Sequence, residues 1–201
     1  LGFYSSGLFH VFTHAFFKAM LFMGAGGMIM ALHHEQNIFK MAQNRVQLPI
    51  ISFCMLVGVI AISGIPPFSG FFSKDAILAA AFQDGEYLIW AIGMFTAFLT
   101  AFYMFRMYFI LFVAPNKKIA QYTYSPKTVT LPMLILSIGA IGAGFLNFPA
   151  IFGGEAGVDM WLAQLNSETI HLSHATEYIL MVASIAVAGA GIFMAYKKYA
   201  K

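Results

Sequence analysis

The sequence predicts an all-α membrane protein: a polytopic transmembrane helix bundle with one discontinuous (broken) helix. Of the 201 residues, 60% are hydrophobic and 9% are charged, whereas a typical soluble domain has about 25% charged residues. Apolar segments of about 20 residues, the length that crosses a hydrocarbon core of about 30 Å, recur along the chain. None of them alternates between apolar and polar residues as barrel strands do, so we interpret all of them as helices.

Five apolar segments are long enough to span a bilayer, and we expect them to form a single membrane domain over residues 1–201. They cover roughly 8–32, 50–82, 87–113, 131–148 and 175–196. The chain begins at Leu1 and runs directly into an apolar stretch, so we interpret it as an internal or C-terminal piece of a longer protein.

The second segment, 50–82, is too long for one straight crossing. It contains SGIPPFSGFF, where Pro66 and Pro67 remove two backbone donors and glycines at positions 64 and 70 make bending easier. We therefore expect a helix that is broken near residues 64–70.

Lys and Arg are concentrated in alternate connections between the segments. They occur in 33–49, in 114–130 and in the tail YKKYAK, whereas 83–86 and 149–174 contain Asp and Glu but no Lys or Arg. Because cytoplasmic loops are enriched in Lys and Arg, we place the first group inside and the second outside. The first segment then runs from outside to inside, and the C-terminus is cytoplasmic.

Only four of the 19 Lys, Arg, Asp and Glu residues lie well inside an apolar segment: Lys18, Lys74, Asp75 and Arg106. A charged side chain at the bilayer centre costs about 2.5–3.5 kcal/mol on insertion scales, so such residues usually face the bundle interior and mark ion paths. The single Cys54 has no partner for a disulfide and no metal-ligand spacing, and we interpret it as a buried packing residue.

The stretch HVFTHAFFKAM places His10, His14 and Lys18 at intervals of four, which puts them along one side of a helix at steps of about 6 Å. A metal site is disfavoured because the HExxH acid is missing. A structural role, with the imidazoles bonded to neighbouring helices, stays open. Proton transfer is favoured, because His and a desolvated Lys both exchange protons near neutral pH. Because steps of about 6 Å are longer than a direct hydrogen bond, proton transfer along these residues would need bridging water.

Lys74 and Asp75 follow the expected break in SGFFSKDAIL. A broken transmembrane helix exposes backbone dipoles and admits water, as at the ion sites of transporters. Ser69 and Ser73 are candidates to cap the first turn of the resumed helix. The dipole of that helix would favour the negative charge of Asp75 near its N-terminus. Neighbours point about 100° apart, so Lys74 and Asp75 need not pair, and a structural salt link to another helix is the alternative.

Arg106, in AFYMFRMYFILF, differs because guanidinium does not release its proton in proteins. We interpret it as a fixed charge. Two explanations stay open: its head reaches the inner interface, or it pairs with a carboxylate inside the membrane.

Four stretches resemble the antiporter-like subunit L (chain 5) of bacterial respiratory complex I, the NADH-quinone oxidoreductase: LFHVFTHAFFKAMLFMGAG, HHEQNIFKMAQ, SGIPPFSGFFSKDAIL and TAFYMFRMYFILF. The resemblance covers most of the chain and is loose over 149–174. It implies that Lys18 is the central lysine of a proton channel, that His10 and His14 connect to it, and that Lys74, with Asp75 beside it, is the terminal lysine.

The resemblance implies a proton-translocating subunit of an inner-membrane translocase, driven by quinone reduction in other subunits. It implies no cofactor in this chain, no nucleic acid, and partners that are other membrane subunits and the lipid bilayer, with NADH and quinone reached only through those subunits. Family members also carry an upstream broken helix with a Lys and a paired Glu, and a downstream lateral helix, neither of which this sequence contains. A subunit of a multisubunit cation/proton antiporter without redox chemistry is the alternative.

Overall fold

The structure is a computed structural model that describes residues 2–41, 47–114, 127–148, 154, 157–162, 170 and 172–200. The described residues form seven α-helices and one 3₁₀ helix and no strand, which confirms the all-α membrane bundle. Their order is α1 (Tyr4–Ala31), α2 (Pro49–Ser63), α3 (Ser69–Gln83), α4 (Tyr87–Phe112), α5 (Lys127–Gly142), η1 (Ala143–Asn147), α6 (Gly157–Leu162) and α7 (His174–Tyr199).

Four of these elements are long and apolar enough to cross a membrane: α1, α4, α5 continued by η1, and α7. α2 and α3 have 15 residues each, so each is about 22 Å long and shorter than a hydrocarbon core of about 30 Å. The two short helices, joined through residues 64–68, form the discontinuous helix that the sequence predicts.

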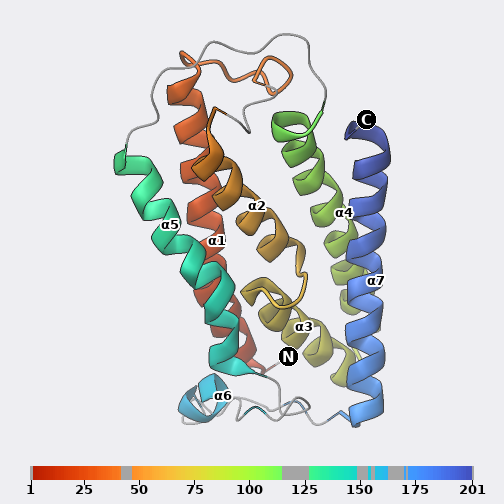
Figure 1. Cartoon of the computed structure of the whole chain (residues 1–201). Helices are drawn as coiled ribbons and strands as arrows, with labels where there is room; N and C mark the ends of the chain where they lie inside the picture. Colours follow the sequence, from red (N-terminus) through yellow and green to blue (C-terminus); the bar gives the residue numbers. More distant parts are fainter. Residues whose placement is uncertain are drawn as a thin grey trace.

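Figure 1 shows α1 and α5 on one side of the bundle, α4 and α7 on the other, and the α2–α3 pair between them. The ends of α1, α4 and α7 lie at one end of the bundle together with the starts of α2 and α5. The starts of α1, α4 and α7 lie at the opposite end. Several of the loop charges used for the predicted orientation, among them Arg45, Lys117 and Glu168, lie outside the described residues.

The break has a defined backbone geometry. α2 ends at Ser63 and is capped by Gly64, whose φ of 73° is left-handed and whose N–H donates to the carbonyl of Ala61. α3 resumes at Ser69 after the extended Phe68, and no side chain caps its first turn. The expectation that Ser69 or Ser73 caps this helix is therefore wrong. Gly70 allows the two halves to meet, because a Cβ there would collide with the backbone carbonyl of Ala61.

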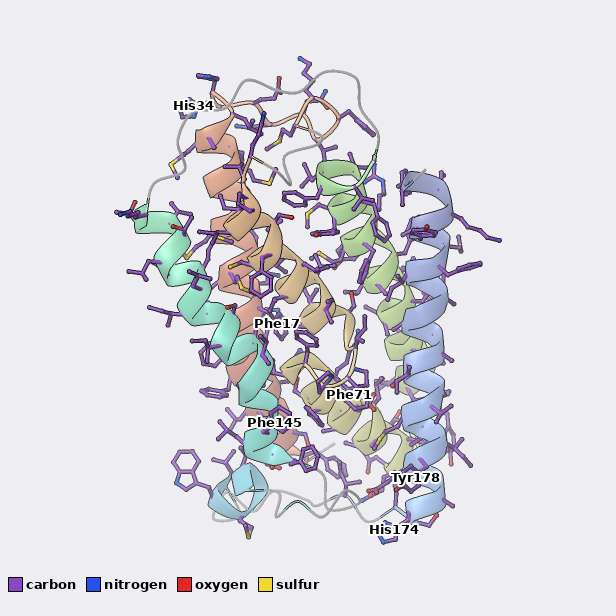
Figure 2. The ribbon with its side chains drawn as sticks, in the orientation of Figure 1. Phe17, His34, Phe71, Phe145, His174 and Tyr178 are labelled. Carbon is purple, nitrogen blue, oxygen red and sulfur yellow. The ribbon has the colours of Figure 1, made fainter. Side chains whose placement is uncertain are left out.

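The interior is filled by Phe, Met and aliphatic side chains from α1, α2, α4 and α5. Phe17 and Met20 on α1 and Met55 on α2 are at most 1% exposed. Figure 2 shows Phe17 in the middle of α1 and Phe71 on α3, and both side chains are buried. Phe71 belongs to a second, smaller cluster with Phe9 and Phe72. Beyond the break, this separate cluster packs α3 against the start of α1.

The outward faces of the spans carry large apolar side chains. Leu88 on α4, Ile138 on α5 and Ile179 on α7 are each 68–73% exposed. In water such surfaces would promote aggregation, whereas hydrocarbon solvates them at no such cost. The exposed apolar surface is therefore the surface expected for a bundle inside a bilayer.

α7 packs closely on α4 through a row of small residues. Its buried positions are Ser184, Ala188, Gly191 and Ala195, spaced at helical intervals. A Cβ at Gly191 would lie 2.6 Å from the backbone oxygen of Phe98 and 3.1 Å from Cβ of Ala101. Small residues let helix backbones approach in membranes, where van der Waals packing drives association.

We predict that Gly191→Ala separates α7 from α4, because backbone atoms on α4 cannot move aside as a flexible side chain would. Overpacking of this kind costs about 1–3 kcal/mol. The apparent melting temperature of the purified membrane protein should fall by several degrees. Gly189→Ala is the matched control, since a Cβ at that exposed position meets nothing within 4 Å. Equal melting temperatures for the two variants would contradict this account of the α4–α7 contact.

Candidate functional site

The polar stripe of α1 is present, with its histidines side by side. The ring centroids of His10 and His14 are 5.7 Å apart, and the His14 ring also contacts the edge of Phe17. Both histidines are partly buried. No group of three or more metal-ligating residues exists among the described residues, so within that part nothing favours a metal site at the stripe.

His10 is joined to the broken helix by a hydrogen bond. Its Nδ1 lies 3.1 Å from Oγ of Ser73 on α3, and Thr13 donates to the same Ser73 Oγ at 2.8 Å. Thr13 and Ser73 are both 0% exposed. Because the Ser73 oxygen accepts from Thr13, its own proton can be donated to His10 Nδ1, which leaves the histidine proton on Nε2. This three-residue group ties α1 to α3 directly before Lys74.

Lys74 and Asp75 occupy the second turn of α3 and have different neighbours. Cδ of Lys74 lies 3.4 Å from the place where a Cβ on Gly64 would be, so the lysine runs along the end of α2. One Asp75 oxygen, Oδ1, accepts a 2.6 Å hydrogen bond from Ser184 on α7. The salt bridges found in the described part of the chain do not include a Lys74–Asp75 pair. The expectation that adjacent residues need not pair agrees with this geometry.

Three buried oxygen atoms lie at or beside the break without a hydrogen-bond partner among the described residues. They are the second carboxylate oxygen of Asp75 and the hydroxyl oxygens of Ser63 and Ser69. Ser63 ends α2 and Ser69 begins α3, so the two hydroxyls flank the interruption. Buried polar groups of this kind bind water or ions where there is room for them.

Lys18 lies on the outer surface of α1. It is exposed, as are Leu8, Val11 and Phe22 along the same helix, and its ammonium lies 5.8 Å from the Phe22 ring centre. No hydrogen bond joins Lys18 to His14 among the described residues. The stripe therefore begins at the surface of this chain and ends at the broken helix inside it.

Arg106 lies near the C-terminal end of α4 and contacts the end of α7. Its guanidinium carbon is 5.3 Å from the ring centre of Tyr199. Neither salt bridge in the described part of the chain involves Arg106. Of the two explanations left open by the sequence, this position favours the interfacial one. Cys54 is 0% exposed with a free thiol, in keeping with a packing role.

Sequence reasoning did not find the hydroxyl partners of the site. Thr13 follows His10 by three residues and Ser73 precedes Lys74 by one, and hydroxyl groups in apolar helices commonly bond to neighbouring helices. That signal marks the residues as candidates. Ser184, at 109 residues from Asp75 along the chain, had no such local signal.

Comparison with known proteins gives a consistent result. The family described as NADH:quinone oxidoreductase/Mrp antiporter, TM, matches residues 2–100. NADH-quinone oxidoreductase subunit L of Escherichia coli (strain K12) is 38% identical over 193 residues, which cover 96% of this chain and 30% of that protein. The chloroplastic NAD(P)H-quinone oxidoreductase subunit 5 of Mesostigma viride is 34% identical over 220 residues, covering 100% of this chain and 33% of that protein.

A third relative is more similar over a shorter range. NAD(P)H-quinone oxidoreductase chain 5 of Synechocystis sp. is 50% identical over 120 residues, 56% of this chain and 18% of that protein. Some of these curated relatives match almost all of this chain. The chain spans only about a third of the length of those relatives.

We predict that Ser184→Ala destabilises the bundle, because it removes the donor from a buried carboxylate oxygen. Hydrogen bonds to charged groups contribute about 1.5–3 kcal/mol, and the apparent melting temperature should fall accordingly. Ser137→Ala is the matched control, since that buried hydroxyl donates only to the carbonyl of Leu134 in its own helix. If the two substitutions lower the melting temperature equally, the Ser184–Asp75 bond has no special role.

Proposed function

Since the chain belongs to the NADH:quinone oxidoreductase/Mrp antiporter transmembrane family, we propose that it forms part of the proton path of a membrane subunit of an NADH-quinone oxidoreductase. The redox reaction takes place in other subunits of such a complex, and this chain contributes side chains that hold and pass protons. NADH and quinone are then reached only through partner subunits.

The observation that carries the proposal is the hydrogen bond between His10 and Ser73. It joins the ionisable stripe of α1 to the helix break, where Lys74 and Asp75 lie. Without that contact the stripe and the break would be two separate polar features. With it, ionisable and hydroxyl groups continue from Lys18 through His14 and His10 to Ser73.

Each member of this series can accept and release a proton or relay one. An imidazole and an amine each bind and release a proton, and a hydroxyl both donates and accepts. The 5.7 Å between the His10 and His14 rings is bridged by water in this proposal. Relay toward Ser73 uses the other tautomer of His10, with its proton on Nδ1. Nε2 then accepts a proton from the bridging water, Nδ1 gives its proton to the Ser73 oxygen, and the serine releases its own hydroxyl proton, while Thr13 holds the serine oxygen in place.

The break supplies the polar end of the path. Carbonyl groups at the end of α2, amide groups at the start of α3 and the buried hydroxyls of Ser63 and Ser69 surround it. Discontinuous helices offer such groups to ions and water at membrane depth. Lys74 runs along this opening, and Asp75 is held to α7 by Ser184. We propose that Lys74 exchanges protons with water here, with Asp75 as the neighbouring negative charge.

We propose that the exposed face of α1 packs against protein, because a lysine facing lipid at the bilayer centre would cost about 2.5–3.5 kcal/mol. Relatives about three times as long as this chain have enough further sequence to cover it. Lys18 is then the point at which the path enters this segment from the covering part.

We propose that the protein is located in the inner membrane with the C-terminus of this segment in the cytoplasm. The support is the alternation of Lys- and Arg-rich connections along the sequence. The relatives favour the redox complex over the cation/proton antiporter, since the proteins of Escherichia coli, Synechocystis and Mesostigma viride are all named as quinone oxidoreductase subunits.

We predict that Lys18→Arg assembles normally but pumps poorly, because Arg keeps the positive charge and loses the ability to release a proton. In the full-length subunit within its complex, the ratio of protons pumped to electrons transferred should fall by at least about half. Lys127→Arg, at the exposed start of α5, is the matched control. A near-normal ratio in Lys18→Arg would show that the residue serves only as a fixed charge.

We predict that Ser73→Ala lowers proton pumping while the complex assembles, since it removes the link between His10 and α3. The solvent deuterium isotope effect on pumping should also change, which a purely structural role would not cause. Thr100→Val is the control, because that buried hydroxyl donates only to the carbonyl of Thr96 in its own helix. Unchanged pumping and an unchanged isotope effect in Ser73→Ala would rule out the serine as a relay.

A further inference from the structure

The C-terminal ends of the packed helices α4 and α7 lie at the same end of the bundle (Figure 1). Three cationic residues lie near these helix ends: Arg106 on α4, and Lys197 and Lys198 on α7. The guanidinium carbon of Arg106 is 5.3 Å and the ammonium of Lys198 is 5.5 Å from the ring centre of Tyr199. The ammonium of Lys197 is 4.4 Å from the ring centre of Phe193. The proton path described above uses none of these residues.

This cationic group has no carboxylate partner in the part of the chain that the structure describes. The two salt bridges found there join Lys40 to Glu35 and His174 to Glu177. Glu35 also accepts the N–H groups of Gln36 and Asn37 within its own loop. Asp84, Glu86 and Glu177 flank the starts of α4 and α7, at the opposite end of the bundle. Within the described residues, these cations are therefore available to an anionic ligand.

From the lengths of the helices, we expect the heads of the three cations at the level of the lipid headgroups. α4 has 26 residues and is about 39 Å long, so it projects a few ångströms beyond a hydrocarbon core of about 30 Å at each end. Arg106 precedes the last helical residue, Phe112, by six positions, or about 9 Å. Its long side chain extends toward the interface, and Lys197 and Lys198 are in the last turn of α7.

The surface around these cations is apolar. Phe193, Met194 and Tyr196 on α7 are each at least 50% exposed. A ligand that matches both features has an anionic headgroup at interface depth and hydrocarbon chains below it. Guanidinium binds phosphate oxygens in a two-pronged manner and lysines add point charges, whereas a free phosphate would leave the apolar surface unused.

We propose that Arg106, Lys197, Lys198 and Tyr199 bind the phosphate of an anionic phospholipid, with its acyl chains against the exposed side chains of α7. Basic residues between or beside transmembrane helices at the cytoplasmic side recognise such lipids. The lipid would fix the end of α7 against α4. This inference is independent of the proposed proton path, and neither depends on the success of the other.

The test uses the full-length subunit in its complex, in phosphatidylcholine nanodiscs that contain a photoactivatable phosphatidylglycerol. After illumination, mass spectrometry measures labelling of the α7 peptide that contains residues 193–199. Lys197→Gln with Lys198→Gln should lower the labelling by about 25-fold, since each cation near a charged surface contributes about fivefold. Both lysines are exposed, so this variant is expected to fold. Arg106→Gln is a second variant, with an expected reduction of about fivefold.

Lys127→Gln removes an exposed cation from the same end of the bundle on α5, and it should leave α7 labelling unchanged. Excess unlabelled phosphatidylglycerol should compete, and inorganic phosphate at the same concentration should not. The proposal is overturned if the double variant labels like the unmodified protein, if Lys127→Gln reduces labelling equally, or if inorganic phosphate competes as well. A carbodiimide cross-link from Lys198 to a carboxylate of another subunit would also overturn it and assign the surface to a protein contact.

Discussion

Hydrocarbon offers no hydrogen-bond partner to a polypeptide, and this constraint explains most of the structure. A continuous helix satisfies its own backbone, so α4 and α7 can face lipid along their length. The α2–α3 helix cannot, because residues 64–68 interrupt it and expose backbone groups. Such an interruption is tolerated only where protein or water covers it. The broken helix accordingly lies in the middle of the bundle, with α1 and α5 on one side and α4 and α7 on the other (Figure 1).

The polar side chains near the break follow from the same constraint. Thr13 and His10 on α1 form hydrogen bonds with Ser73, and Ser184 on α7 donates a hydrogen bond to Asp75. Each bond satisfies a buried group and at the same time ties one neighbouring helix to α3. Close packing supports them, since Gly70 lets α3 approach α2 and Gly191 lets α7 approach α4. The fold and the candidate site are therefore held by the same contacts.

Local sequence patterns were sufficient to predict the long apolar helices and the break, but not the short helix α6 within the connection 149–174. Length and hydropathy mark the spans, and the Pro and Gly residues of SGIPPFSGFF mark the interruption, because their backbone effects do not depend on neighbouring helices. Contacts between helices could not be predicted in the same way. The pattern of α1 puts His10, His14 and Lys18 on one side, but it does not say that His10 meets Ser73 while Lys18 stays at the surface. Such facts depend on helix rotation and neighbours, and one sequence contains no signal for them.

Among the cationic residues inside the apolar segments, the lysines and the arginine differ both in chemistry and in depth. Lys18 and Lys74, well inside the apolar spans, are of the type that can release a proton, and they accompany two histidines of the same ability. Arg106 instead carries a guanidinium group. It lies near the end of α4 beside Tyr199, where a permanent charge can reach the interface. A permanent charge in the proposed path would block a cycle of protonation, whereas at the interface it can bind a headgroup together with Lys197 and Lys198. The placement of lysine in the interior and arginine near the end therefore fits proton transfer along α1 and α3, with a fixed anchor where α4 and α7 end.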